Sequence, residues 1–249
     1  MLGSRDGLPF FMINAIIGKK IDQSQKFLSD GTRIPVTEIE VPDAPVVFVK
    51  NKNKDGYWAI QLGIGTEKKP SKAKSGHIRG AKLESTPRFL REIRLEDIVE
   101  DSLPKIGEKV KLEDVFKPGD MVDIIGVSKG KGYAGVVKRH HFKGGPRTHG
   151  QSDRERAPGS IGQTTTPGRV YKGKRMSGRM GQEKVTIKNL LVVEVTPQKV
   201  LIKGVVPGVR KSIVLITKIG EDKKFLSLYK EEIKEPSFAK ATEGKENAN

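Results

Sequence analysis

Cysteine is absent from all 249 residues of the sequence. This absence excludes disulfide frameworks, thiol nucleophiles and cysteine-based zinc sites, and it favours a cytoplasmic location. A long hydrophobic run is also missing, because the most apolar stretch near the start, residues 8–17, is too short to span a bilayer. Pro9 interrupts that stretch, and Lys19 and Lys20 follow it where a signal peptide needs small residues, so no export signal is predicted.

Acidic and apolar residues are scarce beside the basic ones. The chain has 47 Lys and Arg against 30 Asp and Glu, a formal net charge of +17 and an apolar fraction of only 35%. The low apolar content indicates that part of the chain lies outside any hydrophobic core, and the positive charge indicates a polyanionic partner. Nucleic acid is the first candidate for that partner, and an anionic membrane surface is the second.

The residues on either side of the middle of the chain predict mostly short strands. Residues 34–41, 44–51 and 56–65 are rich in β-branched and aromatic side chains, and we expect them to be neighbours in an antiparallel sheet. Strands are also predicted over 121–127 and 211–219, and a hairpin over 185–208. We predict a basic loop over 71–85. Residues 85–101 fit either a helix capped by Thr86, with Pro87 in its first position, or a strand over 90–95, and periodicity does not decide between them.

The middle segment, residues 128–181, differs from its flanks in charge and composition. It has 13 Lys or Arg, two acids and 12 of the 28 glycines, which gives it a net charge of +11. Because strands lie on both sides of it, we expect it to project from a β-barrel or sandwich that the two flanks form together. Its scattered apolar residues cannot offset the entropy of ordering such a backbone, so the isolated segment should be mobile.

The chemistry of this segment favours RNA over a plain flexible linker. Glycine lets backbone N–H groups approach phosphates, Lys and Arg neutralise them, and aromatic side chains can stack on exposed bases. RNA offers such bases in its loops, which B-form DNA does not. If the segment neutralised about 6–10 phosphates, its affinity would fall steeply with salt.

The stretch GKGYAG, residues 130–135, matches the glycine pattern of nucleotide-binding loops. A dinucleotide-binding fold would need a helix after the glycines and a second strand that ends in an acid. Asp153 and Glu155 stand at about the right distance, but the residues between contain neither a useful helix nor a strand. The kinase glycine loop also matches as far as Val137, but the other kinase motifs are missing, and the chain has no P-loop.

No catalytic, metal or cofactor site is predicted. His140, His141 and His149 have no nearby set of carboxylates or thiols to complete a metal shell. Ser160 does not fit the spacing of a nucleophile elbow, and GRMG at 178–181 lacks the helices that flank the similar clamp of KH domains. Two rival hypotheses stay open: an enzyme that uses residues 130–135 to bind ATP or NAD, and a chaperone or adaptor that carries a basic arm.

Several stretches, taken in order, resemble the universal large-subunit ribosomal protein L-three family in its bacterial form. They span nearly the whole chain: IIGKK from Ile16, DGTRIPVTEIEV from Asp30, GYWAIQLGIG from Gly56, VDIIGVSKGKGYAGVVKRHHF from Val122, THG from Thr148, APGSIGQTTTPGRVYKGKRMSGRMG from Ala157, VTIKNLLVVEV from Val185 and KGVVPG from Lys203. Members of the family usually begin at a Met just before the first strand, so Met12 is a candidate for the true start, and the first 11 residues are either an extension or the result of a misplaced start codon. Asp22, Gln23 and Ser24 replace the usual G-M-T of the family.

The resemblance implies a mainly β fold: a closed antiparallel β-barrel body, translation-protein-like, with a long irregular basic extension inserted between strands. It also implies a structural constituent of the large ribosomal subunit rather than an enzyme. Such a protein binds large-subunit ribosomal RNA and neighbouring ribosomal proteins in the cytoplasm, supports early subunit assembly, and reaches toward the peptidyl-transferase centre. The glutamine of GSIGQ is methylated in some bacterial members, which makes Gln163 a candidate for a glutamine methyltransferase.

These inferences divide the chain into five segments. They are an N-terminal extension (1–11), the first part of the barrel body (12–127), the RNA-penetrating extension (128–182), the second part of the body (183–229) and a flexible tail (230–249). The predicted RNA-binding residues are Lys129, Lys131, Lys138, Arg139, His140, His141, Phe142, Arg147, His149, Arg154, Arg156, Arg169, Tyr171, Lys172, Lys174, Arg175 and Arg179.

Overall fold

The computed structural model describes residues 13–95, 103–148, 150–151, 153–222 and 225–229. The predicted N-terminal extension and C-terminal tail lie outside these residues. The described part of the chain is built mainly of strands, so the prediction of a mainly β protein is confirmed. None of the described helices is both long and apolar enough to cross a membrane.

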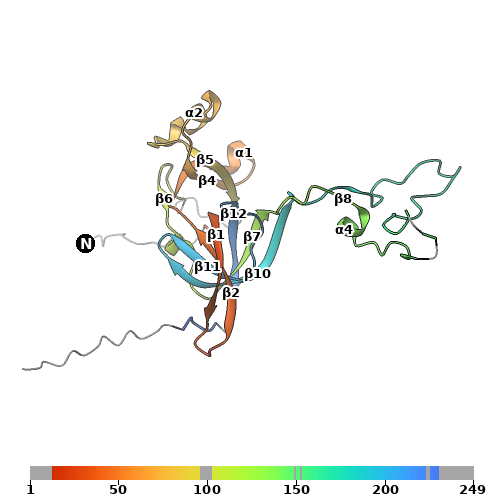
Figure 1. Ribbon diagram of the computed structural model, residues 1–249. Coiled ribbons are helices and arrows are strands. Elements are labelled where there is room, and N and C mark those ends of the chain that lie inside the picture. The colour runs from red at the N-terminus through yellow and green to blue at the C-terminus, as the bar shows by residue number, and fades with distance from the viewer. Residues whose placement is uncertain (1–12, 96–102, 149, 152, 223–224, 230–249) are drawn as a thin grey trace, which may run out of the picture.

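Six strands form a closed barrel at the centre of the body (Figure 1). Each strand pairs antiparallel with the next, and the last pairs back with the first. In spatial order the strands are β1 (Ala15–Phe27), β12 (Ile213–Glu221), β7 (Asp120–Val127), β10 (Lys184–Thr196), β11 (Lys199–Lys203) and β2 (Arg33–Glu40).

In the barrel strands β7, β11 and β12, buried positions alternate with more exposed ones. In β7 every second residue from Asp120 to Gly126 is buried, because neighbouring side chains on a strand point to opposite faces of the sheet. The buried set includes Val122 and Ile124, which join Ile16, Ile39 and Ile216 in one core. The predicted strand over 121–127 and the hairpin formed by β10 and β11 are confirmed.

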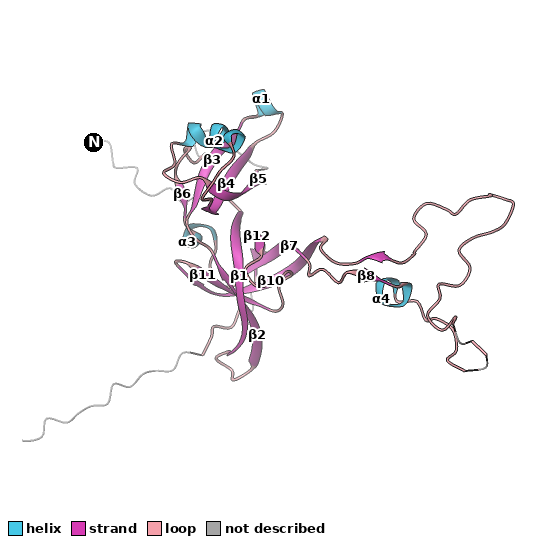
Figure 2. Cartoon of the chain, turned by 45° about the horizontal axis from the view of Figure 1, so that its top comes forward, coloured by secondary structure: helices cyan, strands magenta, loops and turns pink. Residues whose placement is uncertain are grey.

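A second sheet lies beside the barrel and shares its core. It has the order β5-β4-β3-β6, and its strands are β3 (Ala44–Lys50), β4 (Ala59–Thr66), β5 (Pro87–Arg94) and β6 (Lys109–Val110). Short helices accompany it: α1 (Lys52–Asp55), α2 (Lys72–Ile78), the 3-10 helix η1 (Arg79–Ala81) and α3 (Leu112–Val115). Figure 2 shows α1 and α2 at the end of this sheet that is distant from β2.

Two sequence predictions are wrong in this region, and one open choice is settled. Residues 34–41 were expected beside 44–51, but β2 has both edges occupied by β1 and β11, so only β3 and β4 are neighbours. Residues 71–85, the predicted loop, contain α2, whose cap is Ser71: its Oγ accepts a hydrogen bond from the Lys74 N–H at 3.3 Å. Of the two structures considered for residues 85–101, the strand is the one observed, as β5.

Candidate nucleic-acid interface

Residues 128–181 leave the barrel at the end of β7 and return at the start of β10 (Figure 1). Their two limbs run side by side near the barrel. The N–H of Ser128 donates to the Glu183 carbonyl at 2.9 Å, and the N–H of Lys131 donates to the Met180 carbonyl at 2.9 Å. Gly181 has a φ of +77°, and a Cβ at this position would collide with the Lys129 carbonyl oxygen. A glycine is therefore required where the limbs pack together.

Beyond this base, a small set of contacts ties the limbs together again; we call it the brace. Strands β8 (Tyr133–Ala134) and β9 (Gly178–Arg179) pair antiparallel, and helix α4 (Val136–His140) follows β8. Arg139 Nη1 donates to the Met176 carbonyl at 2.9 Å, and His140 Nε2 lies 2.9 Å from the same oxygen. The hydroxyls of Tyr133 and Ser177 are hydrogen bonded at 2.9 Å.

The brace explains what the GKGYAG stretch does in the structure. Gly135 is the N-cap of α4, which ends after five residues at His141, where φ is +60°. The glycines thus lead through a two-residue strand into a helix of little more than one turn. In the described residues, no strand follows α4 before β9, so the element that a dinucleotide site requires is missing there.

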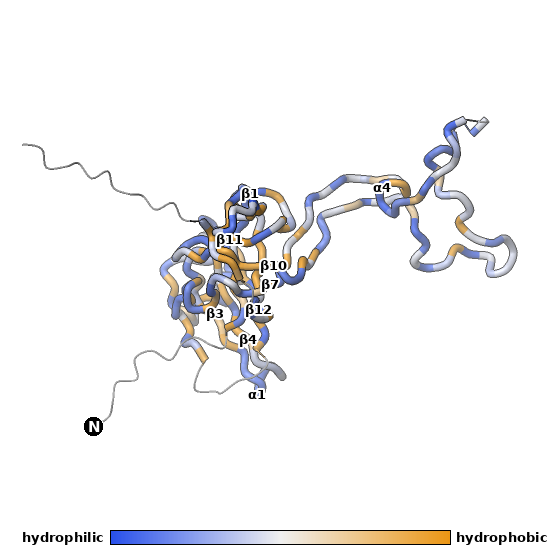
Figure 3. The backbone as a smooth tube through the Cα atoms, turned by 90° about the horizontal axis from the view of Figure 1, so that it is seen from below, coloured by the Kyte–Doolittle hydropathy of each residue, from blue (hydrophilic) through white to orange (hydrophobic). Residues whose placement is uncertain are grey.

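The predicted RNA-binding residues are mostly exposed along the extension. Three of them, Arg139, His140 and Phe142, are half-buried near the brace, and His149 lies outside the described residues. Figure 3 shows the extension coloured mostly as hydrophilic, with isolated apolar residues. The exposed residues are Lys129, Lys131, Lys138, His141, Arg147, Arg154, Arg156, Arg169, Tyr171, Lys172, Lys174, Arg175 and Arg179.

Some of these side chains already have a partner within the chain. Arg147 Nε lies 2.9 Å from Glu155 Oε1, although its side chain is 85% exposed. Arg139 and His140 are used in the brace. Two exposed residues of the extension, Lys143 and Tyr133, were not among the predicted contact residues. Lys143 is a further cation that forms no ion pair in the described residues, and the side chain of Tyr133 is 75% exposed although it belongs to the brace. Their position among the predicted residues was the signal that could have found them.

The distal part of the extension contains a hollow of about 460 Å³. Phe142, Lys143, Gln151 and Arg154 line it, together with the backbone of several glycines. An aromatic ring, two cations and an amide are groups that contact bases and phosphates of single-stranded RNA.

The Ser160 hydroxyl donates a hydrogen bond to the Gly162 carbonyl at 3.1 Å. This contact belongs to a turn and is no catalytic arrangement.

A buried lysine, Lys20, holds the loop that follows β11 beside the base of the extension. Lys20 is only 6% exposed, and its Nζ donates to the Val206 carbonyl at 2.7 Å and the Gly208 carbonyl at 3.2 Å. Burial, and then repulsion from Lys129, lowers the pKa of the Lys20 amine. Gly208 in turn packs against the carbonyl of Val127, the last residue of β7. The loop after β11 is thus fixed at the point where the extension begins.

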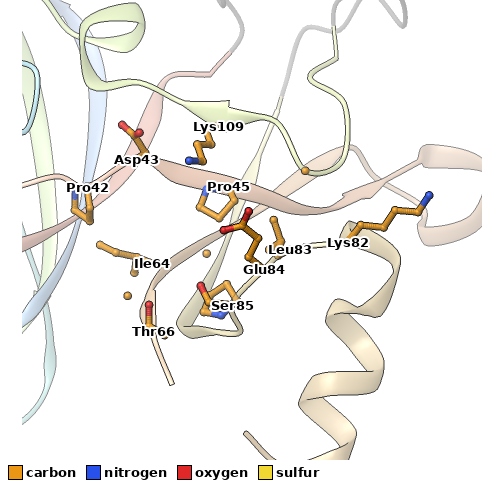
Figure 4. Close-up of a pocket in the computed structure, with 14 residues that line it drawn as sticks. Pro42, Asp43, Pro45, Ile64, Thr66, Lys82, Leu83, Glu84, Ser85 and Lys109 are labelled. Atoms are coloured by element: carbon orange, nitrogen blue, oxygen red, sulfur yellow. The ribbon is translucent and has the colours of Figure 1, made fainter. Parts of the chain in front are cut away.

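A separate pocket of about 470 Å³ lies on the second sheet, and none of the predicted RNA-binding residues lines it (Figure 4). Its wall combines prolines with side chains of both charges, including Asp43, Glu84 and Lys109, while Lys82 extends away from the others. Within the described part of the chain, no group of three or more His, Cys, Asp or Glu is placed to hold a metal ion. The extension is therefore the leading candidate site.

Comparison with known proteins gives two kinds of match, to a family model and to individual relatives, and both point to the same family. A family model described as ribosomal protein L3 matches residues 94–199, which contain β7, the whole extension and β10. Curated relatives match a longer part of the chain. The large ribosomal subunit protein uL3 of Dehalococcoides mccartyi is 50% identical over 212 residues, which cover 84% of this chain and 100% of that protein.

Two further relatives with the same name come from other bacteria. The protein of Herpetosiphon aurantiacus is 47% identical over 211 residues, which are 83% of this chain and 97% of that protein. The protein of Chlorobaculum parvum is 46% identical over 208 residues, which are 82% and 98% of the two chains. Identity at this level over nearly the full length of each relative establishes a common family, and the chain belongs to the ribosomal protein L3 family.

Proposed function

We propose that this chain is a structural constituent of the large ribosomal subunit and that it binds ribosomal RNA through residues 128–182. The observation that carries the proposal is the exposure of 13 predicted contact residues along two limbs that hold almost no acid of their own. Phosphate neutralisation would supply most of the binding free energy, and the exposed aromatic side chains would stack on bases.

The family is a structural ribosomal family, so the prediction that the chain is not an enzyme is confirmed. The finer parts of the proposal follow from the resemblance. The five segments keep their predicted roles, with a barrel similar to those of other translation proteins at the subunit surface and the extension reaching toward the peptidyl-transferase centre. The chain would join the subunit early in assembly, in the cytoplasm, beside neighbouring ribosomal proteins.

Deletion of residues 144–168 tests the proposal. The deletion removes the distal extension and leaves β8, α4 and β9 in place. We expect the shortened chain to keep the barrel, as measured by circular dichroism and urea unfolding, and to be depleted from large subunits in a sucrose gradient. A shortened chain that folds and builds fully active subunits would show that the extension is not the functional part. Saturable binding of ATP or NAD to the intact free protein would favour the enzyme hypothesis instead.

Modification of Gln163 is a separate part of the proposal. The side chain is exposed in the distal extension, where a glutamine methyltransferase could reach it before the subunit is assembled. We expect mass spectrometry of the protein isolated from ribosomes to find one added methyl group on the peptide that contains Gln163. A wholly unmodified peptide from the natural source would contradict this part alone.

A further inference from the structure

The positive charge of the chain gathers in two places, and only one of them is the extension. Residues 50–94, which we call the basic lobe, contain 12 Lys or Arg and four acids, a net charge of +8. The extension, residues 128–182, has a net charge of +11. The combined net charge of these two regions is larger than the +17 of the whole chain, so the remaining residues have a net charge of −2. The acids Glu96, Asp97, Glu100 and Asp101, which follow the lobe, lie outside the described residues.

Three of the four acids of the basic lobe are used internally, by its two least exposed lysines and by a turn, while the fourth, Glu84, is exposed and lines the pocket of Figure 4. Lys50 Nζ lies 2.8 Å from Glu92 Oε2, and both side chains are about one quarter exposed (26% and 29%). The hydrogen bond between these two side chains raises the pKa of Lys50 and lowers the pKa of Glu92. Lys74 pairs with Glu67 and also donates to the Arg88 carbonyl at 2.7 Å. Asp55 accepts a hydrogen bond from the Asn51 N–H at 3.2 Å.

The remaining ten cations of the basic lobe are exposed. None of them forms an ion pair with an acid in the described part of the chain. They come from α1 and α2, the turn before α2, the 3-10 helix η1 with the residue that follows it, and the edge strand β5: Lys52, Lys54, Lys68, Lys69, Lys72, Arg79, Lys82, Arg88, Arg91 and Arg94. Exposed like charges repel one another, so a cluster of this kind is stabilised when a polyanion neutralises it.

The lobe presents these cations on a rigid support. Helix α2 is fixed over the sheet by His77, whose Nε2 lies 2.6 Å from Gln61 Oε1 and whose ring lies 5.9 Å from that of Phe48. Tyr57 is held between two cations, with Lys50 Nζ 4.8 Å and Arg94 Cζ 4.7 Å from its ring centre. Figures 1 and 2 both place α1 and α2 at one end of the body, while the extension leaves from the end of β7 in another direction.

We propose that the basic lobe is a second RNA-binding surface, which binds the phosphate backbone of RNA independently of the extension. The inference rests on the proposed ribosomal function and adds a contact region to it. Protein interfaces have apolar centres and are depleted in lysine. Among the large apolar side chains of the lobe, all of them in the described residues, none is exposed, and the exposed Phe48 on the neighbouring strand β3 lies against His77 of the lobe. The surface therefore fits a phosphate backbone better than a protein partner.

A matched pair of full-length variants tests this surface. The lobe variant replaces Lys52, Lys68, Lys69 and Lys72 with Gln, which removes four positive charges without removing any ion pair found in the structure. The control variant makes the same change at four exposed barrel and connecting-loop lysines, Lys26, Lys117, Lys188 and Lys203. Both should keep the unfolding midpoint of the natural chain, because surface substitutions away from specific contacts change stability little.

Binding is measured with in vitro transcribed large-subunit ribosomal RNA of Dehalococcoides mccartyi, the source of the relative that is 50% identical to this chain. The measurement is repeated across a range of salt concentrations. Loss of four phosphate contacts should reduce the slope of log affinity against log salt by about 3 in the lobe variant. Its affinity at low salt should fall at least about tenfold, whereas the control variant should match the natural chain.

Three outcomes are distinct. A lobe variant that binds RNA like the control overturns the proposal. A lobe variant that binds RNA normally but is lost from large subunits in a sucrose gradient also overturns it, because the partner of the lobe would then be a protein. The chain with residues 144–168 deleted, measured beside them, tests the extension: unchanged RNA affinity there contradicts the proposed function, while the lobe is judged by its own pair of variants.

Discussion

Lys20 shows how a single buried charge can fix a loop that matters for the whole extension. Its amine donates hydrogen bonds to two backbone carbonyls, those of Val206 and Gly208. Burial of an ammonium group is unfavourable unless it is hydrogen bonded. The two carbonyl bonds offset that cost, and they connect β1 to the loop on which the end of β7 rests.

Replacement of Lys20 with Met should lower the free energy of unfolding by about 1–3 kcal/mol, because two buried carbonyl groups lose their donor. The effect should depend on pH. The pKa of Lys20 is lower in the folded protein than in the unfolded chain, so the unfolded chain binds this proton more tightly. The contribution of Lys20 to stability therefore increases as the pH rises toward its unfolded pKa of about 10.4.

Urea unfolding of both proteins at pH 8 and at pH 10 measures this dependence. The difference between the natural chain and the Lys20→Met variant should be larger at pH 10. A difference that shrinks as the pH rises would show that the folded protein stabilises the charged amine instead.

At the scale of elements, the sequence was sufficient to predict the strands that are rich in β-branched residues and bounded by turn residues. β7, the hairpin of β10 and β11, and β12 follow directly from their β-branched residues. Sheet membership was beyond reach, because β2 resembles β3 in composition and only its two-sided pairing places it in the barrel. Helix α2 was missed because only one of its residues, Ile78, is buried, so it leaves no apolar periodicity.

The extension shows a similar division between what composition predicts and what contacts decide. Charge and glycine content were sufficient to locate the candidate site and most of its exposed cations. They could not show that Arg139 and His140 both meet the Met176 carbonyl, since this contact joins residues 36 and 37 positions apart. Local sequence does not reveal which cations of a basic segment face inward.

The brace provides a prediction at this scale. Replacement of Arg139 with Ala removes a hydrogen bond from a charged group, so the free energy of opening the brace should fall by about 1–2 kcal/mol. Hydrogen exchange of the Lys131 and Met180 amides, which bond across the limbs, should accelerate roughly tenfold. The Lys138→Ala variant is the control, because Lys138 is the exposed neighbour on α4. Equal exchange in the two variants would mean that Arg139 does not hold the limbs together.

For the whole molecule, the decisive property is how its charge is distributed over the fold. Outside the basic lobe and the extension, the remaining residues have a net charge of −2, while each of those two regions is strongly positive. The regions share no strand pairing, since the lobe is attached through β3, β4 and β5 and the extension through β7 and β10. Two contact surfaces on one body would fix the orientation of the protein on RNA as well as its affinity.

Independence of the two surfaces leads to a quantitative expectation. Sites without shared contacts contribute additively, within about 0.5 kcal/mol. A chain that combines the four Lys→Gln changes of the basic lobe with deletion of residues 144–168 should therefore lose RNA affinity by the product of the two separate fold-changes. The four dissociation constants, measured at one salt concentration, test this product. A combined variant that binds no more weakly than the deletion alone would contradict independence, because the lobe would then contact RNA only after the extension had bound.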